Sequence, residues 1–164
     1  MSWWESELSD FEWVNVLTNV AYAGFGILSG DLLFGTAMCW LAVGSGLFHA
    51  KRTKVTTAID HSGMYAAMGT LAVPYWGTTL WFAVVGAVLP GNVLVPAMGF
   101  LFILAVWGAW SALPVFALAY VIWNVGKRRW DDDANPQTAP WYARYCHGAW
   151  HVLTAYGMWM VWVG

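Results

Sequence analysis

Two histidines near the end of the chain stand at a spacing that suits a shared metal ion. His147 and His151 are four residues apart, at the head of the last apolar run. In a helix this spacing places both imidazoles on one face, one turn apart. A third histidine, His49, lies far upstream in a similar apolar setting. Three imidazoles leave one tetrahedral position of zinc open for water, as in catalytic zinc sites.

A serine and an aspartate accompany His49. Ser45 precedes His49 by one helical turn, and Asp60 lies about one turn into the next apolar run. Asp60 could take a proton from an activated water and pass it on, and Ser45 could donate to a developing oxyanion. Structural roles remain open, with Ser45 as a packing residue and Asp60 as the orienter of a histidine. We expect His61 to be a hydrogen-bonding residue between helices.

The composition indicates that these residues are carried by a membrane protein. Of the 164 residues, 60% are hydrophobic and 10% are charged, whereas a soluble domain is about 25% charged. Long apolar runs separated by short polar breaks are typical of a polytopic helical membrane protein. The first ten residues contain three acids and no base, which predicts no cleavable signal peptide. No basic patch indicates nucleic-acid binding.

The apolar runs predict an all-α protein with a single domain over residues 1–164, a seven-transmembrane helix bundle with short loops. Glycine and proline breaks delimit the runs, and residues 127–140 form the one long polar loop. The helices between residues 74 and 126 are shorter than the roughly 20 residues a span needs, so they require a thin bilayer or short spans. The helices are expected at 11–28, 32–50, 56–73, 76–89, 93–110, 112–125 and 141–163.

The number of helices decides whether the histidines can meet. His49 ends the second predicted helix and His147 begins the seventh, and four helices between them place both at the same membrane face. Every basic residue of the chain falls on that face, which the positive-inside rule makes cytoplasmic, with the N-terminus inside and the C-terminus outside. These residues are Lys51, Arg52, Lys54, Lys127, Arg128, Arg129 and Arg144.

The two cysteines, Cys39 and Cys146, both lie in apolar segments. We interpret them as buried thiols and not as a disulfide. Cys146 is adjacent to His147, and neighbouring residues of a helix point to different faces, so it is not expected to share the metal.

The five candidate residues lie in motifs that resemble those of the alkaline ceramidase family. This family belongs to a wider superfamily of seven-helix metal hydrolases that includes the progestin and adiponectin receptors. The resemblance implies that the three histidines bind zinc, that Asp60 handles protons and that Ser45 stabilises the oxyanion. The motifs are Gly44-Ser45-x-x-Phe48-His49-Ala50, Asp60 eleven residues after His49, and His147-x-x-Trp150-His151.

The N-terminal region also resembles the ceramidase branch. Glu12-x-x-Asn15-x-x-Thr18-Asn19 is similar to its helix-one signature, and Ser2-Trp3-Trp4-Glu5-Ser6-Glu7 is similar to its calcium segment. Ser2, Trp4 and Glu7 differ from the family's residues. The resemblance implies a calcium ion, held by hard oxygen ligands. The ligands would be the carbonyl of Trp3 and the carboxylates of Glu5, Glu7 and Glu12. Alternatively, Ser9-x-x-Glu12 is a capping box and the acids favour a helix N-terminus.

The resulting hypothesis is a zinc-dependent intramembrane amidase, similar to a ceramidase. Its substrate would be ceramide or a similar N-acyl lipid, which it would split into a fatty acid and an amine. Two alternatives use the same metal site. One is a hydrolase that remodels lipid esters, and the other is a receptor-like signalling protein in which zinc is structural.

Overall fold

The computed structural model describes residues 10–88, 108–133 and 141–164, and within these ranges the chain is helical without any β-strand. This confirms the all-α prediction. The elements are α1 (Asp10–Thr18), α2 (Val20–Leu28), α3 (Leu32–Ala50), α4 (Lys54–Ala72), α5 (Trp76–Val88), the 3-10 turn η1 (Trp110–Ala112), α7 (Leu113–Asp133) and α8 (Trp141–Val163).

The expected helix at 11–28 is interrupted at Asn19, which separates α1 from α2. Two side chains there bond to their own helix: the Thr18 hydroxyl donates to the Val14 carbonyl at 2.9 Å, and Asn19 Nδ2 donates to the Asn15 carbonyl at 2.8 Å. Such back-bonds compete with the backbone ladder and bend helices. The axis continues because Asn19 keeps helical angles, so α1 and α2 still run as one bent rod.

Two further boundaries differ from those expected. The helix predicted at 93–110 lies mostly outside the described residues, and its last part is wrong: Gly108 has a φ of 65° and is followed by η1. The polar loop expected at 127–140 is also wrong in its first half, because α7 continues to Asp133. Three basic residues at 127–129 stand four positions before three aspartates at 131–133, a spacing that allows pairs of opposite charge along a helix.

Helices α3 and α4 are capped and closely packed. Asp31 accepts from the backbone of Phe34 at 2.8 Å to begin α3, and Thr53 forms a capping box that begins α4. A Cβ added at Gly44 would lie 2.8 Å from the carbonyl oxygen of Ile59, and one at Gly63 would lie 2.7 Å from Cα of Leu41. The two helices therefore approach at glycines, which brings the start of α4 against the end of α3.

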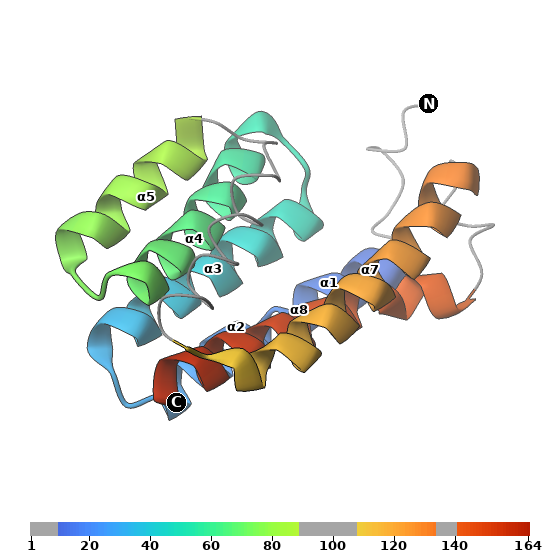
Figure 1. Cartoon of the computed structure of the whole chain (residues 1–164). Helices are drawn as coiled ribbons and strands as arrows, with labels where there is room; N and C mark the ends of the chain where they lie inside the picture. Colours follow the sequence, from blue (N-terminus) through green and yellow to red (C-terminus); the bar gives the residue numbers. More distant parts are fainter. Residues whose placement is uncertain (1–9, 89–107, 134–140) are drawn as a thin grey trace.

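The helices form two groups in Figure 1: α3, α4 and α5 lie side by side, and α1, α2 and α7 run along α8. The bent rod of α1 and α2 contacts both α3 and α8, so it joins the two groups. The core between them contains Tyr22, Phe34, Met38 and Ala155. The ring of Phe34 stacks on that of Trp162 at a centroid distance of 4.9 Å, which ties the start of α3 to the end of α8.

The outer surface carries many large apolar side chains. Leu32, Ile27 and Leu28 are 78%, 72% and 71% exposed, and similar residues lie on α4, α5 and α7. By length and composition, α3 is the one helix in the described ranges that could cross a membrane. Shorter apolar helices cover Trp13–Leu28, Trp76–Val88 and Trp110–Gly126. The seven-span arrangement stays a prediction.

Candidate metal centre

The three predicted zinc histidines form one cluster. The ring centroid of His49 lies 4.8 Å from that of His147 and 5.2 Å from that of His151, and the last two are 4.7 Å apart. One potential ligand atom from each lies within 4.8 Å of the other two. His49 is 3% exposed and His151 is 1% exposed, while His147 is half-buried. The expected convergence of three distant histidines is confirmed.

The elements explain this convergence. His49 is next to the last residue of α3, and His147 and His151 occupy the first half of α8. Both ends lie against the rod of α1 and α2, which contacts α3 and α8. The three side chains therefore meet where the end of α3 and the first half of α8 lie against this rod.

The nitrogen donors fit a single small metal ion. Three imidazole nitrogens around a tetrahedral zinc at about 2.0–2.1 Å are about 3.3 Å apart. The cluster is within side-chain rotation of that geometry, since its ligand atoms all lie within 4.8 Å of one another. In addition, Nε2 of His151 is buried and has no hydrogen-bond partner among the described residues. A buried acceptor of this kind is costly unless something binds it.

Ser45 and Asp60 are buried beside this cluster. The side chain of Ser45 hydrogen-bonds the carboxyl group of Asp60, which also lies within electrostatic range of His49. This contact joins α3 to α4 at the close approach of Gly44. Ser45 therefore has a polar partner on the neighbouring helix.

His61 and the cysteines lie outside the cluster. His61 follows Asp60 on α4, and it is absent from the group of possible metal ligands found among the described residues. The Nδ1 atom of His61 is buried and has no hydrogen-bond partner among the described residues. The expected interhelical hydrogen bond is therefore not made at that atom. Cys39 and Cys146 are free thiols, as predicted, although both are half-buried and not buried.

The predicted calcium ligands cannot be placed together. Trp3, Glu5 and Glu7 lie outside the described residues, and Glu12 falls in the first turn of α1, where the structure describes the backbone but not its side chain. Calcium binding therefore stays a prediction.

Several polar residues of α1 and α2 contact the histidine cluster or lie next to it, although the sequence analysis assigned them no individual role. Thr18 Oγ1 lies 3.0 Å from Nδ1 of His151. The Tyr22 ring lies 5.9 Å from the His151 ring, and its hydroxyl is 2.6 Å from the hydroxyl of Thr154. Asn15 is fully buried, and neither side-chain polar atom has a partner among the described residues. The signal was present: positions 15, 18, 19 and 22 share one face of an otherwise apolar helix.

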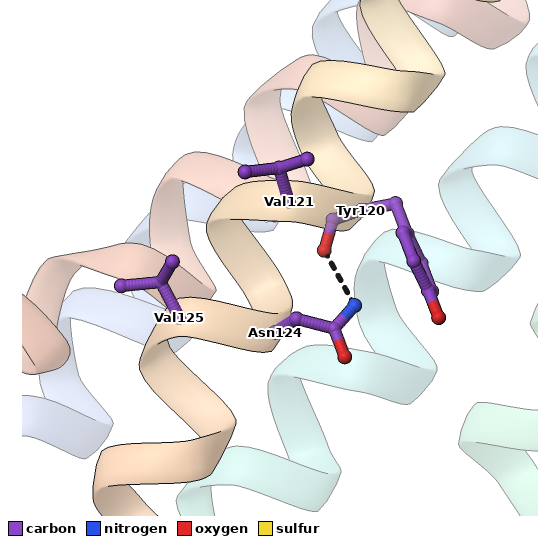
Figure 2. Close-up of a pocket in the computed structure, with 4 residues that line it drawn as sticks. All are labelled: Tyr120, Val121, Asn124 and Val125. Carbon is purple, nitrogen blue, oxygen red and sulfur yellow. Dashed lines mark hydrogen bonds between the residues drawn. The ribbon is translucent and has the colours of Figure 1, made fainter.

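A pocket of about 300 Å³ lies on α7, and its described lining includes no residue of the histidine cluster (Figure 2). The described residues that line it are Tyr120, Val121, Asn124 and Val125, and Nδ2 of Asn124 donates to the carbonyl of Tyr120 at 2.8 Å. None of these residues is a metal ligand or a strong base. The pocket therefore adds no catalytic group, and the histidine cluster remains the candidate site.

Compared with protein-family models, with curated proteins and with solved structures, the chain matches none of them. The resemblance to the alkaline ceramidases therefore depends on the motif residues alone.

Proposed function

We propose that the protein is a zinc-dependent hydrolase of membrane lipid amides, similar to a ceramidase. The observation that carries the proposal is the meeting of three histidines from two distant helices with the Ser45–Asp60 pair beside them. Buried histidines and a buried carboxylate are costly in an apolar interior. Their shared location is best explained by a common chemical task.

The cluster suits zinc in particular. Neutral imidazoles are among the preferred zinc ligands, and three of them leave a position open, which is typical of catalytic sites. When bound, zinc would supply an activated water at neutral pH and polarise a carbonyl group. His49, His147 and His151 would hold it.

Asp60 and Ser45 would handle the proton and the developing charge. Asp60 would accept a proton from the attacking water and deliver it to the leaving nitrogen. Protonation removes the charge of the carboxylate, so the hydrogen bond from Ser45 becomes weaker. The Ser45 hydroxyl is then free to turn to the oxyanion of the substrate. Ser45 and Asp60 would thus be hydrogen-bonded to each other before the reaction. During the reaction Asp60 would carry the proton and Ser45 would stabilise the oxyanion.

A lipid substrate is supported by the surface of the protein. Large exposed side chains such as Leu32 and Ile27 favour a lipid environment. The segment that follows His49 carries Lys51, Arg52 and, at the first position of α4, Lys54, which favours a cytoplasmic site near the lipid head groups. An amide close to the head group, as in ceramide, would lie at a suitable depth.

The proposal is tested by metal analysis and hydrolysis assays on the protein purified in detergent. We expect about one zinc per chain and release of fatty acid from ceramide. His151→Ala should lose both, whereas His61→Ala, which changes a half-buried histidine outside the cluster, should keep the zinc. A metal-free wild-type protein with intact helices would contradict the proposal.

The same experiment separates the alternatives. A panel of N-acyl and ester lipids distinguishes an amidase from an ester hydrolase with the same site. Stoichiometric zinc without turnover of any lipid would favour a receptor-like protein. Calcium in the same analysis, removed by changing Glu5 and Glu7, would support the N-terminal calcium site.

A further inference from the structure

The contact between Thr18 and His151 restricts where the histidine carries its proton. Thr18 Oγ1 lies 2.9 Å from the carbonyl oxygen of Val14 and 3.0 Å from Nδ1 of His151. A hydroxyl has one proton and can accept with its lone pairs. The Val14 carbonyl can only accept, so the hydroxyl proton goes to it. With its proton directed to that carbonyl, as the 2.9 Å contact favours, Thr18 accepts from His151 and Nδ1 carries the hydrogen.

A second contact supports the same protonation. The His151 ring has a hydrogen bond with the backbone of Asn15, whose carbonyl also accepts from Asn19 Nδ2 at 2.8 Å. Backbone carbonyls of α1, which can only accept, therefore lie beside the His151 ring and its Thr18 partner. In a neutral imidazole the other nitrogen, Nε2, then holds the lone pair. This is the buried atom that has no partner among the described residues.

A glycine makes the contact possible. A Cβ at Gly148 would lie 3.0 Å from Cγ2 of Thr18, 3.0 Å from Cγ1 of Val14 and 3.2 Å from Oγ1 of Thr18. Gly148 is one turn before His151 on α8, and it is buried. The missing side chain therefore lets α1 approach α8 at the position where the hydroxyl meets the ring.

We propose that Thr18 is a positioning residue that holds His151 in the tautomer with Nε2 free for the metal. The inference rests on the proposed metal centre, but it concerns α1, a helix that supplies none of the three histidines. Residues that orient a metal-bound histidine set its tautomer and ring direction, and their loss typically lowers metal affinity about 10- to 100-fold.

The chain offers a matched control on the same seam, which is the contact of α1 and α2 with α8. The Tyr22 hydroxyl lies 2.6 Å from the hydroxyl of Thr154, about one turn beyond the contact of Thr18. Tyr22→Phe removes a buried hydrogen bond between the same two helical segments. It keeps both the aromatic ring beside His151 and the Thr18 hydroxyl that contacts Nδ1. It therefore reports on a general loosening of the seam.

The test combines zinc affinity with a direct readout of the tautomer, for the full chain in detergent. Zinc affinity is measured by competition with a chromophoric chelator, and the tautomer of His151 by ¹⁵N NMR of the metal-free protein. Thr18→Val should weaken zinc binding about 10- to 100-fold and should shift the ring toward a mixture of tautomers. Thr18→Ser should restore both, and Tyr22→Phe should change neither.

Two results would overturn the inference: an unchanged affinity and tautomer in Thr18→Val, or an equal loss in Thr18→Val, Thr18→Ser and Tyr22→Phe. Failure of the proposed function is a different outcome, because it is absence of zinc from the wild-type protein. In that case the tautomer of His151 in wild type and Thr18→Val still decides the role of Thr18.

Discussion

Asp60 and Ser45 form a buried polar contact beside the three histidines. The carboxyl group is buried, and the Ser45 hydroxyl is its hydrogen-bond partner from the neighbouring helix. Neither side chain belongs to the group of possible metal ligands found in the described part of the chain. Changes at these positions should therefore separate chemistry from metal binding.

Asp60→Asn should lower the rate of amide hydrolysis about 10²- to 10⁴-fold, because the amide cannot carry the proton. Ser45→Ala should lower it about 10²- to 10³-fold through loss of a donor to the oxyanion. Zinc content should stay at the wild-type level in both variants. Loss of zinc together with activity would instead assign these residues to the metal site.

At the scale of elements, glycines determine how closely α3 and α4 approach. Gly44 faces the backbone of α4 next to Asp60, whereas a Cβ at Gly46 would meet nothing within 4 Å. The two glycines lie on the same helix, two residues apart, so they provide a matched pair. Substitution of Gly44 tests the packing of α3 against α4, and substitution of Gly46 tests only helix propensity.

Gly44→Ala should destabilise the protein by about 1–3 kcal/mol, because the new methyl group overpacks the α3–α4 contact. It should also lower activity, since α4 carries Asp60. Gly46→Ala should be neutral or stabilising by up to about 1 kcal/mol, as expected for an unhindered glycine in a helix. Thermal unfolding in detergent and the hydrolysis assay measure the two effects. Equal stability of the two variants would contradict the packing of these helices.

Helices α4 and α5 are joined by a buried contact between Thr70 and Thr79, whose hydroxyl oxygens are 2.9 Å apart. Thr70→Val removes this hydrogen bond with little change of shape, and we expect a loss of about 0.5–1.5 kcal/mol. Thr36→Val is the control, because the exposed Thr36 hydroxyl bonds only to the Leu32 carbonyl of its own helix in the described residues. Its effect on the unfolding midpoint should be close to zero.

At the scale of the whole molecule, the exposed apolar side chains and the distribution of basic residues lead to a topology that can be measured. Lys51 follows α3 near the histidines, and Tyr75, which is 66% exposed, lies in the turn between α4 and α5. A spanning α4 would place these two positions on opposite sides of the bilayer.

Lys51→Cys and Tyr75→Cys, each in a chain without Cys39 and Cys146, test this topology with a membrane-impermeant maleimide. Intact cells should label position 75 and inverted vesicles position 51, because the basic loop is expected to be cytoplasmic. Labelling of both positions from one side would exclude the proposed arrangement, whatever the enzymatic result.

The sequence by itself determined most of the helices and the three histidines that were expected to meet. Apolar runs and breaks such as Gly30-Asp31 and Pro74 are local signals, and they predict α3, α4, α5 and α8 nearly to the residue. The spacing of His147 and His151 is likewise local, because a helix converts four residues into one turn. His49 was expected to join them because four intervening helices were predicted, and that number stays a prediction since residues 89–107 lie outside the described residues.

Only the tertiary structure decided how the helices turn toward one another. The contact of Thr18 with His151, the approach at Gly148 and the hydrogen bond between Ser45 and Asp60 depend on the rotation and register of packed helices. Local periodicity does not encode these quantities, since many rotations bury similar apolar area. Close packing selects one of them, and that choice leaves Nε2 of His151, the nitrogen proposed to bind the metal, buried and without a hydrogen-bond partner among the described residues.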